Sequence, residues 1–357
     1  MCKPYLHCLA LSFLFVTVSF AQQNPTPALA TLPNPVAMPK KTDGRIHLDV
    51  VVTDKSGKPV TGLDLNDFTL LDDNQPSKIL SFKAIDGAVQ KADPPVEVIL
   101  LLDTVNLPFG QVSIARQQID KFLRQNGGHL AQPVSILVLN DKSLDAQGQP
   151  STDGNAQAEA FSQIETRLRP STLTAGTYGA VERFLMSLKT LRGIANFERV
   201  KPGRRLLIWV GPGWPMIGGI YIGRSDAGRQ ADFMKIVEFS TRLREARVSV
   251  YSVSFGQSDE VTTLYRSFLK GVKTADDASA TNVALKVLAV QSGGRVLGPD
   301  GDITAQINSC IEDAQAYYTL SFDPPRASGP NEYHDLKVQI DKPKLTARTN
   351  TGYYNQP

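Results

Sequence analysis

The sequence predicts an α/β fold with a doubly wound, mainly parallel sheet, and an additional β module built from the two ends of the chain. Three patterns lead to this prediction. Continuous aliphatic runs such as VEVILLLD (96–103) are typical of strands that helices cover on both faces. Segments with helical spacing of apolar residues follow these runs, and such alternation favours right-handed crossovers in a parallel sheet. Near each end of the chain, apolar residues instead alternate with polar ones, as in half-buried strands.

The bulk composition indicates a globular protein with a sizeable core. The chain has 357 residues, of which 41% are hydrophobic and 20% are charged. The formal net charge of +3 is small, and no run of Lys and Arg with interleaved aromatic residues occurs. We therefore expect no nucleic acid as a partner.

Residues 1–21 are predicted to be a secretory signal. Lys3 precedes the apolar stretch LALSFLFVTVSF, and Ser19 and Ala21 supply small residues at the −3 and −1 positions of a cut after Ala21. The stretch is short for a membrane span, although an uncleaved anchor is the alternative. Residues 22–43, rich in proline and polar residues, are predicted to be a linker. We therefore expect a secreted or periplasmic protein that keeps no membrane span once the signal is removed.

Residues 44–92 are predicted to be an N-terminal β segment, and residues 316–357 a C-terminal one. In the first, the acidic turn Asp72-Asp73-Asn74 joins two strands of the run DFTLLDDNQPSKILSF. This turn lacks the spacing of a calcium-binding loop, so an ordinary hairpin turn is expected. From the order of the segments along the chain, we expect the two β segments to pair with each other in a sandwich-like module.

Residues 95–310 are predicted to be the α/β domain. Cys310 lies on a helical stripe with Ile303, Ile307 and Ile311 and is expected to be a small buried core residue. It has no internal disulfide partner, because the other two cysteines lie within the predicted signal. The expected strands cover residues 96–103, 133–140, 204–211, 248–255 and 293–298. A first helix is expected after residue 103, where Val112, Ala115, Ile119 and Phe122 have helical spacing, and further helices are expected at residues 155–168, 178–192, 230–246, 259–270, 279–291 and 302–315.

Sequence motifs of catalysis and nucleotide binding are absent. The chain has no phosphate-binding G-x-x-x-x-G-K-[ST], no H-E-x-x-H and no G-x-S-x-G. The three histidines beyond the predicted signal are His47, His129 and His334, which stand far apart in polar contexts and are expected at the surface. The pattern therefore predicts a protein that is not an enzyme.

The α/β region resembles a von Willebrand factor type A domain, and the chain as a whole resembles the VWFA-related acidobacterial domain family. The resemblance implies a central six-stranded sheet with helices on both sides, and binding at the top of the sheet. It covers about residues 45–355 and rests on the stretches VVTDKSGKPVTGLDLNDFTLLDDNQPSKILSF, LLDTVNLPFGQVSIARQQI, GRRLLIWVGPGWP and YYTLSFDPP…YHDLKVQI…ARTNTGYY.

Type A domains commonly carry a metal-ion-dependent adhesion site of the form Asp-x-Ser-x-Ser, with a threonine and an aspartate from two further loops. Asp103 matches the first aspartate, and Thr177 matches the threonine. However, Val105 and Leu107 replace the two serines, and only Asn106 could add a side-chain carbonyl. Magnesium prefers oxygen ligands in near-octahedral geometry, so two expected donors are missing here.

The third loop of this adhesion site also departs from the pattern. It should follow the strand that ends near residue 210, but no Asp or Glu lies between residues 204 and 225. We therefore expect an incomplete site that holds no cofactor, with Asp103 capping the following helix or turn. The alternative is a weak magnesium or calcium site at Asp103, Asn106 and Thr177.

Aromatic residues stand where such a domain would meet its partner. The stretch VGPGWP places Trp214 after Gly211 and Gly213, and Phe109 follows the first loop. Indole side chains bury much area and keep one polar N–H, which suits an interface anchor. We expect these four residues to bind a partner, with Tyr221 as a further candidate. The alternative is that Trp214 folds back and covers the end of the sheet.

These observations favour an exported, non-catalytic protein of the adhesion type that binds a protein or a cell-surface component. One alternative is a cation-dependent adhesin that uses the weak site at Asp103. Another is an extracellular hydrolase, whose candidate carboxylates would be Asp141 and Asp259 near strand ends. The fold by itself does not decide among these functions.

Overall fold

A mainly parallel five-stranded sheet forms the centre of the α/β domain. The computed structural model describes residues 44–87, 89, 92–165, 176–216, 225–254, 263–298 and 302–357, so the predicted signal and linker lie outside the described residues. The strand order is β7-β6-β5-β8-β9, in which only the edge strand β7 is antiparallel to its neighbour. These strands are β5 (Glu97–Asp103), β6 (His129–Leu139), β7 (Leu144–Asp153), β8 (Arg205–Val210) and β9 (Val248–Val253).

The central sheet has five strands, whereas the resemblance implied six. Strand β7, which the sequence analysis missed, follows β6 through a tight turn in which the Asn140 Oδ1 accepts hydrogen bonds from the backbone N–H groups of Lys142 and Ser143. The expected last strand at 293–298 contributes only one isolated parallel bridge, between Ser252 and Val296. The stretch LDAQGQPSTD of β7 is polar because it forms an edge of the sheet, and it therefore lacks the aliphatic signature of a central strand.

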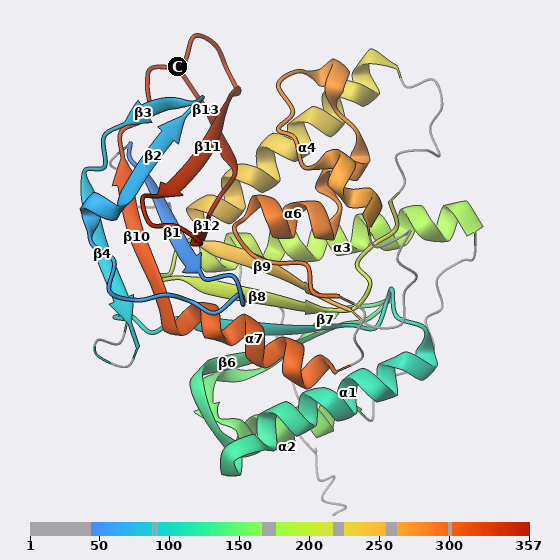
Figure 1. Ribbon diagram of the computed structural model, residues 1–357. Helices are drawn as coiled ribbons and strands as arrows, with labels where there is room; N and C mark the ends of the chain where they lie inside the picture. Colours follow the sequence, from blue (N-terminus) through green and yellow to red (C-terminus); the bar gives the residue numbers. More distant parts are fainter. Residues whose placement is uncertain are drawn as a thin grey trace, which may run out of the picture.

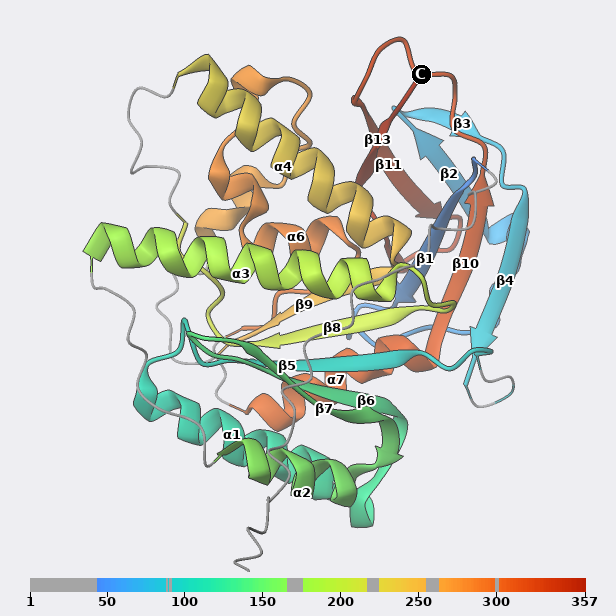
Figure 2. The same ribbon diagram turned by 180° about the vertical axis from the view of Figure 1, so that it is seen from behind.

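Helices lie on both sides of this sheet (Figure 1 and Figure 2). Alternate residues of β5 point to opposite faces: Leu100 and Leu102 belong to one apolar core, and Ile99 and Leu101 to the other. The first core packs against α1 (Phe109–Arg124), α2 (Gly154–Glu165) and α7 (Ile303–Gln315), and the second against α3 (Gly176–Glu198), α4 (Asp226–Glu245) and α6 (Leu285–Gln291). The architecture is therefore mixed α/β with a mainly parallel sheet.

Several short 3₁₀ helices connect these elements. The region expected to be a helix at 259–270 lies partly outside the described residues, and its described part contains one 3₁₀ turn and no long helix. Cys310 is fully buried on α7, which confirms the prediction for this residue. The 3₁₀ helices are η1 (Leu65–Asp67), η2 (Gln125–Gly128), η3 (Leu264–Phe268), η4 (Ala275–Asp277) and η5 (Ala280–Val283).

Strands from the two ends of the chain make up a β-sandwich beside the α/β domain (Figure 1). One sheet has the order β12-β1-β10-β4 and the other β13-β11-β2-β3, so each sheet combines N-terminal and C-terminal strands. The strands are β1 (Ile46–Thr53), β2 (Phe68–Asp72), β3 (Gln75–Ser77), β4 (Ser81–Asp86), β10 (Ala316–Phe322), β11 (Glu332–Ile340), β12 (Thr346–Arg348) and β13 (Gly352–Asn355).

Inward-facing residues of both sheets fill the sandwich core, with Leu48, Leu70 and Tyr353 among the most buried. His334 lies in this module as well. The expectation that His334 is a surface residue is wrong, because only 6% of it is exposed and its ring stacks on Tyr353. The polar context of His334 suggested exposure. In β11, however, His334 lies on the same inner face as Leu336 and Val338, so a polar residue occupies a buried position.

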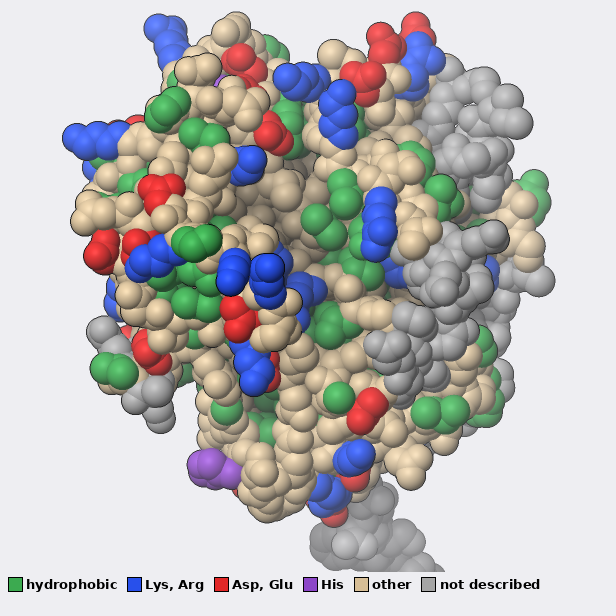
Figure 3. Space-filling view, in the orientation of Figure 1, with side chains coloured by type: hydrophobic (Ala, Val, Ile, Leu, Met, Phe, Trp, Pro, Cys, Tyr) green, Lys and Arg blue, Asp and Glu red, His purple; other side chains and the backbone are tan. Residues whose placement is uncertain are grey.

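Partly buried ion pairs connect the sandwich to the α/β domain. Arg348 of β12 donates two hydrogen bonds of 2.9 Å to the carboxylate of Asp313 on α7, which is fully buried. Arg247, at the turn before β9, pairs with Asp49 of β1. On the outside, charges of both signs are interspersed over the face in Figure 3. Among the described residues, no helix is long and apolar enough to cross a membrane.

Candidate functional site

The carboxyl ends of β5 and β8 define the place where a ligand is expected. From β5 the chain first adds β6 on one side and then returns to add β8 on the other, so the strand order reverses between β5 and β8. Ligands of open α/β sheets bind outside the strand ends at such a switch point. Asp103 ends β5, and the stretch Gly211–Trp214 follows β8, so the structure brings these two predicted segments together.

Two glycines allow the loop after β8 to pass close to its neighbours. Gly211 has a φ of 151°, and a Cβ atom there would lie 2.9 Å from the Cβ of Asp103. Gly213 has a φ of 76°, and a Cβ atom there would lie 2.8 Å from the side chain of Leu285. Any other residue would be strained and crowded at either position. These glycines therefore allow the loop to lie against Asp103 and α6. As glycines, they have no side chain that a partner could contact.

The carboxylate of Asp103 is fully buried and surrounded by hydrogen-bond donors. Its Oδ1 accepts from the backbone N–H groups of Val105 (3.1 Å) and Asn106 (3.0 Å). Its Oδ2 accepts from the Asn106 side-chain amide and from the indole Nε1–H of Trp209, both at 2.8 Å. Each oxygen thus accepts two hydrogen bonds, which satisfies the lone pairs that a metal ion would use.

Burial and these donors act on the Asp103 pKa in opposite directions. Burial raises the pKa because the charged form loses its hydration, whereas the hydrogen bonds from Asn106 and Trp209 lower it. The effect of burial is the larger, so the pKa of Asp103 lies above its ordinary value. The donors therefore offset only part of the cost of placing this carboxylate in the core.

The residues around Asp103 do not fit a magnesium ion. Val105 and Leu107, which stand in the two serine positions, are buried with 5% and 7% of their surface exposed. Asn106 directs its Nδ2 toward Asp103 and toward the Ser187 hydroxyl, 3.1 Å away, so its carbonyl oxygen faces away from the carboxylate. A hard cation needs several oxygen ligands in one shell, and this arrangement presents N–H donors instead.

Thr177 is an exposed residue in the first turn of α3, and no described hydrogen bond joins it to Asp103. The residue of α3 that does reach this region is Ser187, through Asn106. Trp209 was not predicted to belong to this site, because it stands inside an aliphatic run. The signal that could have identified Trp209 is its position one residue before the end of β8, because β8 is the strand next to β5 and Asp103.

Trp214 is buried, with 4% of its surface exposed. Its indole Nε1–H donates a 3.1 Å hydrogen bond to the carbonyl of Val283, and its ring meets the Trp209 ring edge to face at 5.3 Å. Trp214 therefore folds back and covers the end of the sheet. This is the alternative considered for Trp214, and the side chain does not protrude as an interface anchor. Phe109 at the start of α1 is 58% exposed, as an interface residue would be.

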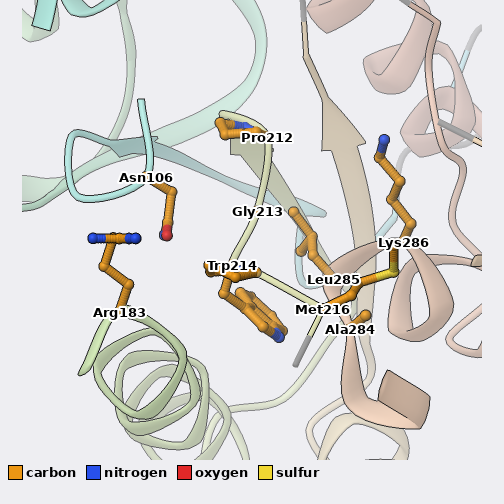
Figure 4. Close-up of a pocket in the computed structure, with 10 residues that line it drawn as sticks. Asn106, Arg183, Pro212, Gly213, Trp214, Met216, Ala284, Leu285 and Lys286 are labelled. Carbon is orange, nitrogen blue, oxygen red and sulfur yellow. The ribbon is translucent and has the colours of Figure 1, made fainter. Parts of the chain in front are cut away.

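A pocket of about 280 Å³ opens at this edge of the sheet. Figure 4 shows Arg183 of α3 and Lys286 of α6 on opposite sides, with Trp214 between them. The carbonyl oxygen of Asn106 is buried and has no hydrogen-bond partner among the described residues, and Figure 4 shows it directed toward the Arg183 side. The remaining lining is mostly apolar and comes from Pro212, Gly213, Pro215, Met216, Ala284 and Leu285.

The pocket combines positive charge with apolar surface. Lys286 is only 7% exposed, and burial lowers its pKa. Arg183 contributes a guanidinium group, whose planar donors suit a carboxylate. An anionic group with an apolar neighbour suits such a lining.

Some candidate residues cannot be placed in this site. Tyr221 and Asp259 lie outside the described residues. Asp141 is a half-buried residue of the turn between β6 and β7. Among the described residues, a second group of potential metal ligands, Asp72, Asp73 and His334, lies in the sandwich.

Comparisons with known proteins give only coarse likenesses. No family model matches the chain, and no curated protein matches it. The solved structures to which the chain is similar include the manganese-loaded TRAP protein of Plasmodium vivax, with 9% identity over 76% of this chain and 97% of that chain and a TM-score of 0.35. They also include a variant of the PilB minor pilin of Streptococcus sanguinis, with 11% identity over 75% of this chain and 78% of that chain and a TM-score of 0.36. The pilus adhesin SpaC of Lactobacillus rhamnosus GG matches with 8% identity over 82% of this chain and 49% of that chain and a TM-score of 0.36. At TM-scores below 0.5 these likenesses carry no argument about function, and membership of the VWFA-related acidobacterial family stays a prediction.

Proposed function

We propose that this chain is an exported, non-catalytic binding protein of the adhesion type, which holds a protein partner at the sheet edge without a metal ion. The observation that carries the proposal is the saturation of Asp103 by four protein donors. A carboxylate in that state has no lone pair left for a bridging cation. The sequence features of a type A domain and of a secretory signal support the adhesion class and the export.

The pocket beside Asp103 is the part of this edge that fits a partner. We infer that it receives an acidic side chain, because Arg183 and Lys286 flank it and supply the positive charge. An apolar residue next to the acid would cover Trp214 and Leu285. A polypeptide carries acidic and apolar side chains next to each other, so it fits this lining better than a simple anion does.

Exposed aromatic residues extend this surface. Phe109 and Tyr178 are 58% and 83% exposed in the first turns of α1, which follows β5, and of α3, which follows α2. Aromatic side chains are enriched where proteins meet, because they bury a large area with few rotatable bonds. We expect them to contact the partner around the pocket.

A peptide-binding measurement tests the proposal. Fluorescently labelled peptide pools with a central Asp or Glu, and matched pools with Asn or Gln, are titrated with the protein in excess EDTA. We expect the acidic pools to bind and the amide pools to bind at least tenfold more weakly. Arg183→Gln and Lys286→Met should each weaken binding about tenfold or more, which corresponds to the loss of one charge-assisted hydrogen bond.

Lys189→Gln is the matched control, since it removes one positive charge from the exposed surface of the same helix. It should leave peptide binding unchanged. Equal affinity for acidic and amide pools, or binding that requires added magnesium, would contradict the proposal.

A further inference from the structure

Three metal-ligating side chains converge in the β-sandwich. Asp72 ends β2, Asp73 is the first residue of the turn to β3, and His334 lies on β11. One ligand atom of each residue lies within 4.8 Å of the others. The cluster joins an N-terminal hairpin to a C-terminal strand, and it has no part in the pocket at the sheet edge.

The distances within the cluster match those in the coordination shell of a small transition metal. The His334 Nδ1 lies 2.9 Å from the Asp72 Oδ1 and 3.4 Å from the Asp73 Oδ2. A tetrahedral shell with zinc-to-ligand distances of about 2.0–2.1 Å has edges of about 3.3 Å between ligand atoms. The three atoms therefore need only small shifts to surround such an ion.

Each carboxylate uses one oxygen for a protein donor and directs the other toward His334. The Tyr353 hydroxyl donates a 2.7 Å hydrogen bond to the Asp72 Oδ2. The backbone N–H of Asp335 donates a 3.0 Å hydrogen bond to the Asp73 Oδ1. The His334 ring is held by stacking on Tyr353, with 4.9 Å between the centroids and 14° between the planes. Metal sites use outer partners of this kind to orient their ligands.

The hairpin between β2 and β3 lets two consecutive aspartates reach the same point. Asp73 and Asn74 have φ values of 47° and 63°, which are the backbone conformations of a tight two-residue hairpin turn. Strand β11 pairs with β2 in a register that sets Leu336 opposite Asp72, so His334 lies just beyond the end of β2. The backbone therefore holds the three side chains together before any ion binds.

The cluster is open to solvent on one side. The Asp73 side chain is 45% exposed, which leaves a path for an ion and for a water ligand. The His334 Nε2 has no hydrogen-bond partner among the described residues, so the polar contacts of this ring are those that its Nδ1 makes with Asp72 and Asp73.

We propose that Asp72, Asp73 and His334 form a binding site for a divalent transition metal, with zinc as the best match. Imidazole nitrogen and carboxylate oxygen together suit zinc, whereas calcium and magnesium prefer oxygen alone. Binding displaces the Nδ1 proton of His334, and a water molecule completes the shell from the exposed side. The ion clamps the β2–β3 hairpin to β11 and so stabilises the sandwich.

Calorimetric titration with zinc chloride tests this site. The protein is the full chain without a polyhistidine tag, stripped with EDTA and then desalted. We expect one ion per chain and a rise in the thermal midpoint at saturation. Asp73→Asn removes the ligand oxygen and its charge, but it keeps an acceptor for the Asp335 N–H and tolerates a φ of 47°. This variant should bind zinc at least tenfold more weakly and show no rise in its midpoint.

Asp335→Asn is the matched control, because it removes a charge beside the cluster and no ligand atom. It should bind zinc as the wild type does. The exposed histidines are tested by a His47→Gln/His129→Gln variant, which should also bind like the wild type. Absence of saturable binding, unchanged affinity in Asp73→Asn, or loss of binding in the double histidine variant would overturn the proposal. Circular dichroism of each variant verifies that the comparison is made on folded protein.

Discussion

Two carboxylate sites in this chain differ in what faces their oxygens. At the end of β5, N–H donors from Val105, Asn106 and Trp209 occupy both oxygens of Asp103. At the β2–β3 hairpin, Asp72 and Asp73 each leave one oxygen directed at the imidazole of His334. A carboxylate at a strand end is therefore not by itself a metal ligand, since the donors around it decide whether a cation can compete.

The two sites also differ in burial. Asp103 is fully buried, whereas the Asp73 side chain is 45% exposed. A buried charge must be satisfied by fixed partners, because water cannot compensate for a missing one. We infer that the sheet edge is a rigid structural element and that the hairpin is a place where an ion can enter and leave.

The largest expected effect is on the free energy of unfolding. It is measured by Asp→Asn substitutions at the two sites, each of which replaces one carboxylate oxygen with an NH₂ group. Asp103→Asn turns an NH₂ group toward donors that need an acceptor, and it should lower the free energy of unfolding by about 3 kcal/mol. Asp73→Asn in metal-free protein should change it by less than about 0.5 kcal/mol, because the side chain is nearly half exposed and Asn keeps an acceptor for the Asp335 N–H. Urea unfolding measures both. Equal costs for the two variants would contradict the contrast between the sites.

A smaller effect is expected from the two tryptophans at the sheet edge. Trp209→Phe removes a donor to a buried carboxylate and should cost about 2 kcal/mol. Trp214→Phe removes a hydrogen bond to the neutral carbonyl of Val283 and should cost about 1 kcal/mol. Both variants keep an aromatic ring, so the difference reports the charge of the acceptor. A larger loss in Trp214→Phe would show that Asp103 does not depend on the indole.

The pH dependence of stability gives a third comparison. Because burial raises the pKa of Asp103, the folded chain binds this proton more tightly than the unfolded chain, whose Asp pKa is about 3.9. The stabilisation from the bound proton is fully present below that value and is lost as the pH rises through the folded pKa. The stability of the wild type minus that of Asp103→Asn should therefore fall as the pH rises over this window. A difference that grows with pH would have the wrong sign.

Much of the fold follows from hydrophobic periodicity. The aliphatic runs of β5, β6, β8 and β9 are unambiguous because helices cover both faces of these strands. Strand β7 could not be predicted in this way, since it is a polar edge strand whose position depends on the turn at Asn140. Which strands pair in a sheet depends on tertiary contacts, so it cannot be predicted from the composition of one segment.

The candidate site was predictable only in part. The missing hydroxyls at Val105 and Leu107 can be read from the sequence, and so can the absence of a carboxylate after β8. The donor that completes the Asp103 environment could not, because Trp209 comes from another strand more than a hundred residues later. The cluster at His334 was missed for the same reason, since its ligands are brought together by pairing between the two ends of the chain.

Magnesium titration of the wild type and of Asp103→Asn, in an isothermal calorimeter, tests the central claim most directly. The claim is that four protein donors saturate Asp103, and it predicts no saturable heat up to millimolar magnesium and no difference between the two proteins. Saturable magnesium binding in the wild type that disappears in Asp103→Asn would contradict it.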